Sequence, residues 1–402
     1  MPPEQPYISH EQTPDARYDA ADTARMDREQ RARMICQSGN HHAILESFRN
    51  PDNRNLLEEH TRALQSDQKL REQLSNILTS LSPAHWEMLT LLHLFDTETF
   101  NHCVRTYQIV QRKLQSTHPV GDFLRAELSR EGILPETLAI SALLHDIGKI
   151  GIPLKDLILN NTLTDQEWYH LSIGHFCEQD GCDTEQAERV LATKLQAGAA
   201  NNLRAKDLVP FSHCLTPEEQ KLLIESGIDP HLTLGEIINR HQDFSGEIAK
   251  IYGLDEIFIA LVSNHHERPL DTQDSLLVSQ SALRIATILR FADVFDALHS
   301  ARTYKKGNPF LTTIAILIQQ SHDGFISPEL AHLWIDEDMQ AFRSSQEEYF
   351  RILPEAIDRE HANEADYSPA MREAIIQKEL SSLQIIHDFL QENPSHEGKS
   401  EV

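Results

Sequence analysis

The sequence has 402 residues, with 62 acidic against 36 basic side chains and a formal net charge of −26. An acidic surface of this kind repels polyanions, so we expect no DNA or RNA polymer as a partner. No apolar run approaches the roughly 18 residues that cross a bilayer, and the first residues lack a secretory signal, so we expect no membrane association. Five cysteines in such a chain indicate reduced thiols, and we expect a cytoplasmic protein.

Composition and periodicity divide the chain into regions. Residues 1–35 are charged and show no apolar period, which predicts a disordered or loosely helical tail. We expect an N-terminal helical region at 36–85, the main domain at 86–345, C-terminal helices at 346–392 and a flexible tail at 393–402. Residues from about 175 to about 233, rich in Gln, Asn and Ala, are typical of an inserted segment. Strand signals are nearly absent, so the predicted fold class is all-α.

Helix starts are well marked along the chain. A serine precedes a proline at three expected starts, where the hydroxyl can cap and the missing proline N–H costs nothing: Ser82-Pro83, Ser327-Pro328 and Ser368-Pro369. Thr164 and Thr216 each stand three residues before a glutamate, the pattern of a capping box. Residues 283–298 are apolar almost all round, which predicts a buried central helix.

The chain carries 22 histidines, an excess that motivates a search for metal ligands. The sharpest candidate is His145-Asp146, which follows the apolar residues 138–144. A carboxylate beside an imidazole can bridge two ions about 3.5–4 Å apart, as a two-metal hydrolytic site requires. The alternative is a histidine at a helix C-terminus, stabilised by the helix dipole and followed by a glycine stop.

Other segments add ligand types. Glu98 and His102 stand four residues apart, so they share one helix face. His265 and His266 follow the apolar run 257–262.

Asp293 lies inside the predicted buried helix, with Asp296 three residues on. A buried carboxylate must be paired or bound to metal, because an isolated buried charge is too costly. Asp293 is therefore either a metal ligand or the partner of an arginine such as Arg284 or Arg290.

Taken in this order, these segments resemble the HD superfamily of metal-dependent phosphohydrolases, and most closely its HD-GYP cyclic-di-GMP phosphodiesterases. The resemblance covers about residues 86–160 and 232–340. The stretches that carry it are Asp96 to His102, His145-Asp146-Ile147-Gly148-Lys149-Ile150-Gly151-Ile152-Pro153, His265-His266-Glu267, Ala292 to Leu298 with Arg302, Tyr304, Lys305 and Lys306 beyond, and Phe325 to Leu330.

The resemblance implies an HD-type helical bundle around a di- or trinuclear metal site, with an N-terminal helical extension and an inserted segment. The implied metal ligands are Glu98, His102, His145, Asp146, His241, His265, His266 and Asp293. It implies catalytic roles for Asp146 and Lys149, and substrate phosphate contacts from Lys149, Arg302 and Lys305. His241 fits best as the middle histidine, because residues 243–248 also resemble the family, and His175 is the rival.

The expected cofactors are two or three divalent ions. Family members often hold iron or manganese, and a ligand set of imidazole and carboxylate without thiolate also permits Zn, Ni or Co. Two other histidine groups are less favoured as sites. The group His175, Cys177, Cys182, His213 and Cys214 matches no familiar zinc spacing, and His41-His42 is interpreted as a surface pair.

One departure from the family bears on the substrate. The Gly-Tyr-Pro loop expected after the paired histidines is missing, and the chain reads Arg268-Pro269-Leu270-Asp271 after Glu267. Glycine-rich loops allow close backbone approach to a ligand, so the substrate lip must be built differently here.

We expect a metal-dependent phosphodiesterase acting on a cyclic dinucleotide, cyclic-di-GMP or a relative. The alternatives are a phosphohydrolase acting on another small nucleotide, and a non-catalytic metal-containing receptor or interaction protein. A homodimer or a protein partner would use the N-terminal region or the insertion.

Overall fold

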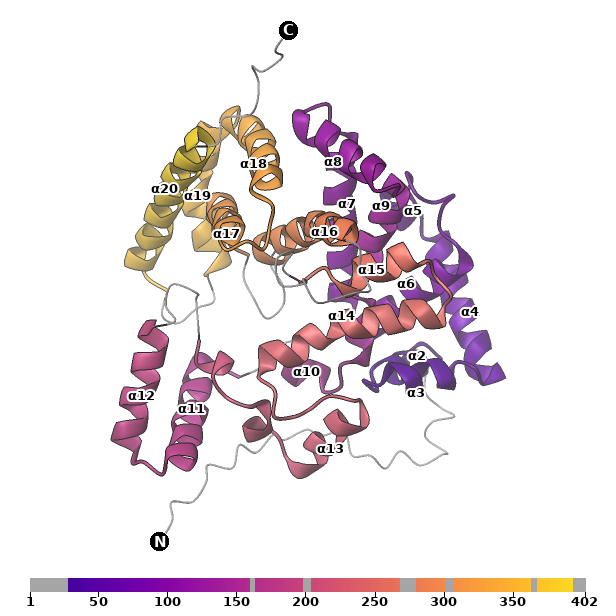
Figure 1. Ribbon diagram of the computed structural model, residues 1–402, viewed down its shortest axis with the longest axis horizontal. Coiled ribbons are helices and arrows are strands. Elements are labelled where there is room, and N and C mark those ends of the chain that lie inside the picture. Colours follow the sequence, from indigo (N-terminus) through magenta and orange to yellow (C-terminus); the bar gives the residue numbers. More distant parts are fainter. Residues whose placement is uncertain are drawn as a thin grey trace.

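The structure is a computed structural model that describes residues 28–159, 163–197, 204–267, 280–300, 307–362 and 367–392. Within these ranges the regular structure is entirely helical (Figure 1), and the only strand-like pairing is an isolated bridge between Pro210 and Thr233. The predicted all-α class is confirmed. None of the described helices combines the length and the apolar character needed to cross a membrane.

The helices follow in chain order. The first half comprises α2 (Arg28–Cys36), α3 (His41–Ser47), α4 (Pro51–Ser66), α5 (Gln68–Gln73), α6 (Pro83–Phe95), α7 (Thr97–Gln115), α8 (Pro119–Arg130), α9 (Pro135–Leu144), the 3₁₀ helix η1 (Ile147–Gly151), α10 (Lys155–Ile158), α11 (Asp165–Asp180) and α12 (Thr184–Ala197). The second half comprises the 3₁₀ helices η3 (Ala205–Asp207) and η4 (Phe211–Cys214), then α13 (Pro217–Glu225), α14 (Leu234–Ile251), α15 (Glu256–Ser263), α16 (Gln280–His299), α17 (Phe310–His322), α18 (Pro328–Arg343), α19 (Gln346–Glu360) and α20 (Pro369–Glu392).

The predicted helix starts are confirmed. Ser82, Thr164 and Thr216 each accept a hydrogen bond from the backbone N–H three residues on, and the side chain at that position bonds back to the cap N–H. The helices α18 and α20 begin at the prolines that follow Ser327 and Ser368. Because each cap satisfies donors that the first turn leaves open, the sequence determines these boundaries locally.

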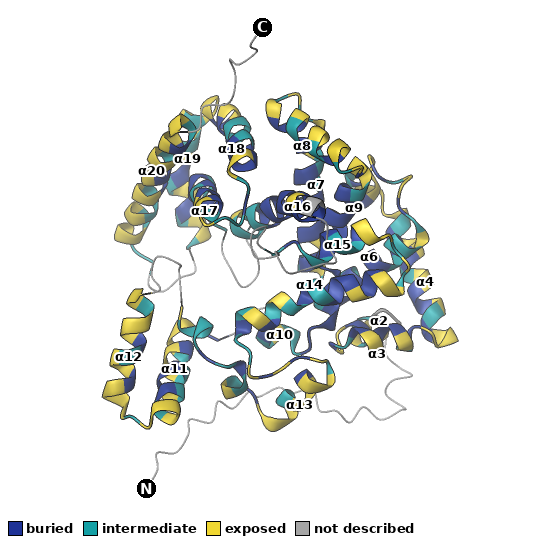
Figure 2. Cartoon of the chain, viewed as in Figure 1, coloured by how far each residue is buried: buried dark blue, intermediate teal, exposed yellow. Residues whose placement is uncertain are grey.

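Helix α16 is the buried centre of the fold. It packs against α7, α9, α15 and α17, and most of it is coloured as buried in Figure 2. Ile285, Leu289 and Phe291 are fully enclosed, and each such side chain contributes about 1.5–3 kcal/mol on burial. The helix predicted at 283–298 is therefore confirmed, and its polar residues Thr287, Arg290, Asp293 and Asp296 lie in the interior as well.

One large apolar core joins the N-terminal, central and C-terminal helices. It runs from Ala32 and Cys36 in α2 to Ile386 and Phe389 in α20. Residues 28–35, expected in the tail, are thus helical, and Ala32 is buried because α2 packs on α6. Residues 1–27 and 393–402, the remainder of the expected tails, lie outside the described residues.

The segment expected as an insertion has its own smaller cores. A second apolar cluster is formed by side chains of α10, α11, η4, α13 and α14 and of the segments that join them, and a third joins α11 to α12. The expected boundary at about residue 175 falls within α11, since this helix runs from Asp165 to Asp180 without a break. The capping box at Thr164 marks where this segment's first helix begins.

Candidate metal centre

Five segments bring imidazoles and carboxylates to one buried place. His102 lies on α7, His145 and Asp146 follow α9, and His241 lies on α14. His265 and His266 follow α15, and Asp293 lies on α16. The segments meet because α7, α9 and α15 pack on α16, while α14 packs on α15 and η1. Seven of the eight predicted metal ligands are therefore neighbours.

Asp146 presents its two oxygens to different imidazoles. Its Oδ1 lies 3.1 Å from His241 Nε2. Its Oδ2 lies 3.5 Å from His145 Nε2, 3.7 Å from His102 Nε2 and 2.6 Å from Lys149 Nζ. A carboxylate that faces two sets of ligands in this way has the arrangement needed to bridge two cations.

Asp293 faces imidazoles. Its Oδ1 lies 2.9 Å from His102 Nε2 and 3.5 Å from His145 Nε2. Of the two arginines considered as partners, Arg284 is exposed, and Arg290 donates a hydrogen bond to the main-chain oxygen of His266. The contacts of Asp293 thus match those of the candidate ligand rather than those of a structural salt bridge.

Three imidazoles are held with a lone pair aimed at the centre. The Nδ1 atoms of His145, His241 and His265 lie 2.6–2.9 Å from the carbonyl oxygens of Ala142, Ile238 and Val262. A carbonyl oxygen only accepts, so each Nδ1 carries a proton and donates. In the neutral ring the inward-facing Nε2 is then free of a proton, as a metal ligand requires.

The inward nitrogens crowd together. His241 Nε2 lies 3.1 Å from His265 Nε2 and 3.3 Å from His266 Nε2. His145 Nε2 is buried and has no hydrogen-bond partner among the described residues. Because buried polar atoms are almost always satisfied, such an orphan beside other inward nitrogens fits a site built for a cation.

The charges also favour a cation. Burial alone would raise the pKa of Asp146 and of Asp293. Nearby Lys149 and His145 nevertheless hold the pKa of Asp146 well below its usual value. His102 and His145 have the same effect on the pKa of Asp293. Burial, with neighbouring His266, lowers the pKa of His265 well below its usual value. In His145 the burial effect is outweighed by Asp146, which raises its pKa. A metal ion at the cluster therefore competes with protonation of His145.

Lowering the pH from 6.5 to 5 should destabilise the metal-free protein. An unfolded histidine takes up a proton near pH 6.5, whereas burial and nearby His241 lower the pKa of His266 to about 3. The unfolded chain binds more protons across this window, so the free energy of unfolding falls by about 2 kcal/mol at pH 5 from His266 alone. Urea unfolding in the presence of a chelator measures the change, and His266→Gln should reduce it. Equal stability at the two pH values would contradict the assignment of a neutral, half-buried His266.

A second carboxylate orients His102 from behind. Asp296 Oδ2 lies 2.7 Å from His102 Nδ1, and Arg105 donates to both oxygens of Asp296 at 2.7 and 2.9 Å. Ser300 Oγ donates to the same carboxylate at 2.8 Å. This is the carboxylate–histidine arrangement that fixes the ring of a metal-bound histidine. In the sequence, the only signal for this arrangement is the position of Asp296, three residues after Asp293 on the predicted buried helix.

Replacing Asp296 by asparagine should weaken divalent metal binding by about 10–100-fold. The amide keeps the shape of the side chain but no longer places a charge behind His102. Competition with a chelator, followed on the folded protein, gives the affinity. Asp243→Asn, at an exposed carboxylate paired with Arg240 on α14, is the matched control. Equal metal affinity in both variants would show that Asp296 does not act through His102.

Ser245 and Gly148 fix the His145-Asp146 turn to α14. Ser245 Oγ donates to the main-chain oxygen of His145 at 2.7 Å and accepts from the Gly148 N–H at 2.9 Å. A Cβ at Gly148 would overlap the main-chain oxygen of His241 and the nitrogen of Ser245. The glycine therefore serves close approach of two backbones, and not the positive-φ helix stop considered from the sequence, because its φ is not among the positive values.

Some predicted residues stand apart from the cluster or are not described. Glu98 lies half-buried in the first turn of α7 and belongs to none of the groups of three ligand atoms within 4.8 Å of one another. Its role at a third ion stays a prediction. Arg302 and Lys305, together with the loop after Glu267, lie outside the described residues.

The rival middle histidine lies elsewhere. His175, on α11, has its Nδ1 3.1 Å from His213 Nε2, and the structure brings His241 to the cluster instead. No group of three potential ligand atoms among the described residues includes His175, His213 or a cysteine. The less favoured zinc site in the expected insertion therefore gains no geometric support.

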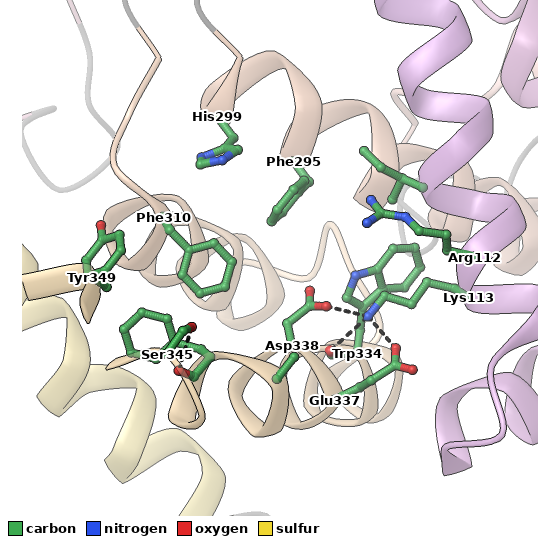
Figure 3. A pocket seen from close by; sticks show the side chains of 13 residues that line it. Arg112, Lys113, Phe295, His299, Phe310, Trp334, Glu337, Asp338, Ser345 and Tyr349 are labelled. Atoms are coloured by element: carbon green, nitrogen blue, oxygen red, sulfur yellow. Dashed lines mark hydrogen bonds and ion pairs between the residues drawn. The ribbon is translucent and has the colours of Figure 1, made fainter. Parts of the chain in front are cut away.

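Two cavities lie beside α16 but do not open onto the imidazoles. One, of about 570 Å³, is lined by Phe295, Phe310 and Trp334, and by Lys113 with its acidic partners Glu337 and Asp338 (Figure 3). The other, of about 520 Å³, reaches Asp296 and Arg105. Neither is lined by any of the seven clustered ligands, and only the second reaches residues that support His102.

The geometry therefore shows buried groups that could hold metal ions. Three of these groups are His102 with His145 and Asp146, His145 with His265 and Asp293, and His241 with His265 and His266. They overlap at His145 and His265, so they make up one centre. Comparison of the chain with family models, curated proteins and solved structures found no match.

Proposed function

We propose that this chain is a metal-dependent phosphodiesterase that hydrolyses a cyclic dinucleotide. The observation that carries the proposal is the overlap of three potential ligand groups around Asp146, whose two oxygens face different imidazoles. One group of three ligands would serve a single ion, whereas overlapping groups suit two or more. The orphaned Nε2 of His145 and the protonated Nδ1 atoms around it support the same interpretation.

Bound divalent ions would lower the pKa of a water molecule and neutralise charge on a phosphoryl group under attack. One ion would be held by His102, His145 and Asp146, and another by His241, His265 and His266. Asp293, which is grouped with His145 and His265, would lie between the two positions. Cys103 Sγ lies 3.9 Å from His145 Nδ1, but burial raises the pKa of its thiol, so it stays protonated. A ligand set of nitrogen and oxygen atoms favours Fe or Mn and permits Zn, Ni or Co.

Lys149 supplies a positive charge at the edge of the cluster. It belongs to η1, three residues after Asp146, and its Nζ lies 2.6 Å from Asp146 Oδ2. From there it can move to a phosphate oxygen while Asp146 is engaged by a cation. Arg302 and Lys305 are proposed as further phosphate contacts on the strength of the family resemblance alone.

The choice of substrate rests on that resemblance. Cyclic-di-GMP phosphodiesterases of the HD-GYP family carry the same order of His-Asp, paired His and Asp segments. The absent Gly-Tyr-Pro loop favours a second candidate, hydrolysis of another small nucleotide at the same centre. The two candidates share their metal chemistry and differ only in the phosphate ester that the site accepts.

A turnover assay on metal-loaded protein tests the proposal. Protein purified without oxygen and loaded with Fe²⁺ or Mn²⁺ is incubated with cyclic-di-GMP, mixed cyclic dinucleotides and a panel of other nucleotides. The expected products are a linear dinucleotide and then mononucleotides. Hydrolysis of the other nucleotides alone would select the second candidate.

Lys149 provides the matched variant in this assay. Lys149→Met should retain bound metal and lose about 10²–10³-fold in kcat, as the removal of one charge-stabilising donor does elsewhere. Lys250→Met, at an exposed position of α14, should keep both properties. Protein with a full complement of metal that leaves every substrate intact would overturn the enzymatic proposal and favour a non-catalytic receptor.

A further inference from the structure

A second group of potential ligands lies outside the central cluster. It consists of His41 and His42, the first two residues of α3, and Glu247 on α14. His41 Nε2 lies 2.9 Å from Glu247 Oε2, and His42 Nε2 lies 3.7 Å from the same oxygen. The pair was expected at the surface, but His41 is only 3% exposed.

The spacing of these atoms suits one tetrahedral cation. Ligand atoms about 2.0–2.1 Å from a zinc-like ion lie roughly 3.3–3.4 Å from one another in a tetrahedron. The two measured distances, 2.9 and 3.7 Å, bracket this value. The rings of His41 and His42 have centroids 4.2 Å apart, close to the 4.1 Å between His265 and His266 in the central cluster. Small side-chain movements would complete the geometry.

The group is separate from the central cluster. Glu247 follows His241 by six residues on α14, which places the two side chains about 120° apart around the helix. His41 packs on Phe244, with ring centroids 4.8 Å apart, and a Cβ at Gly151 would lie 2.9 Å from its Nδ1. This packing holds the His41 ring in place without help from an ion. No ligand atom is shared between the two groups.

The group is also open to an incoming ion. The His42 side chain is 67% exposed and that of Glu247 is 47% exposed. One ligand is thus fixed by packing and two can adjust at the surface, which leaves a fourth position for water. Two imidazoles and one carboxylate are a set that borderline divalent ions such as Zn²⁺ and Co²⁺ accept.

We infer that His41, His42 and Glu247 bind one divalent transition-metal ion at a peripheral site. The ion joins α3 of the N-terminal region to α14, the helix that carries His241 and packs on η1. It thereby ties the N-terminal helices to one of the helices that carry the central cluster. Binding to the folded chain alone also stabilises that chain by mass action.

Metal stoichiometry tests this inference on the full chain. The wild-type protein, His42→Ala and Glu247→Gln are titrated with Co²⁺, and bound metal is measured by elemental analysis and by the visible absorption of tetrahedral Co²⁺. Each variant should bind one equivalent less than the wild type and should keep the remaining equivalents. His170→Ala, at an exposed position on α11, is the control and should match the wild type.

Two results would overturn the inference. Equal stoichiometry in all four proteins would show that the group is only a hydrogen-bonded histidine and glutamate. A similar loss in His170→Ala would show that surface histidines bind Co²⁺ without a built site. The readout is metal content, so absence of phosphodiesterase activity would count against the proposed function and would leave this test intact.

Discussion

Asp146→Ala should remove bound divalent metal and phosphodiesterase activity together, with activity falling by at least about 10³-fold. Asp146 lies within 3.1–3.7 Å of His102, His145 and His241 at once. Without it, inward-facing imidazoles and Lys149 surround a space with only the Asp293 charge to balance a cation, and like charges in a buried site are costly. Elemental analysis and the turnover assay measure the two losses on the same preparation.

Unfolding of the Asp146→Ala protein would also remove metal and activity, so a second variant must separate the two causes. Asp146→Asn keeps the volume and removes the charge, and circular dichroism with urea unfolding reports its stability. Asp243→Asn removes an exposed carboxylate from the adjacent helix α14 and should leave metal and activity unchanged. A folded Asp146→Asn protein with full metal content would show that Asp146 does not bridge the ions.

Gly148→Ala should destabilise the fold by about 3 kcal/mol and displace His241 from Asp146. The added Cβ would overlap the His241 oxygen and the Ser245 nitrogen, both backbone atoms of α14. Backbone cannot rotate away as a side chain can, so α14 and η1 must separate, and overpacking of this kind costs about 1–3 kcal/mol or more. The hydrogen bond between Gly148 N–H and Ser245 is strained by the same shift. Urea unfolding measures the loss in stability, and chelator competition measures the accompanying loss in metal affinity.

Gly235→Ala is the matched control for this effect. Gly235 lies in the first turn of the same helix α14, and nothing lies within 4 Å of a Cβ built there. Alanine at an open helical position changes stability by at most about 1 kcal/mol, in the favourable direction. If Gly148→Ala were as stable as Gly235→Ala and bound metal equally well, close packing of η1 on α14 would not be what positions His241.

Local sequence patterns predicted the helices well because caps and apolar periods act over a few residues. Thr164 and Thr216 cap helices at the positions that the capping-box pattern predicts, and the apolar residues 283–298 lie in the buried helix α16. The convergence of His145, His265 and Asp293 was also predictable, but only by analogy with a family pattern. No local sequence pattern predicts that α9, α15 and α16 pack together.

The supporting contacts were not predictable, because they join residues far apart in the chain. Asp296 and His102 are 194 positions apart, and Ser245 and His145 are 100 apart. His41 and Glu247 are 206 apart, and neither carries a local signal for the other. A histidine in a polar segment gives no sign of burial until the partner helix is known, which is why His41 was expected at the surface.

Anomalous scattering from a crystal shows whether divalent ions bind at Asp146. Protein purified without oxygen is crystallised, and anomalous scattering at the absorption edges of Fe and Mn locates any bound ions. We expect at least two peaks within coordination distance of Asp146, with His145 and Asp293 on one side and His241 and His265 on the other. A map from fully folded protein with no peak at Asp146, after soaking with Mn²⁺, would show that these residues do not form a metal centre.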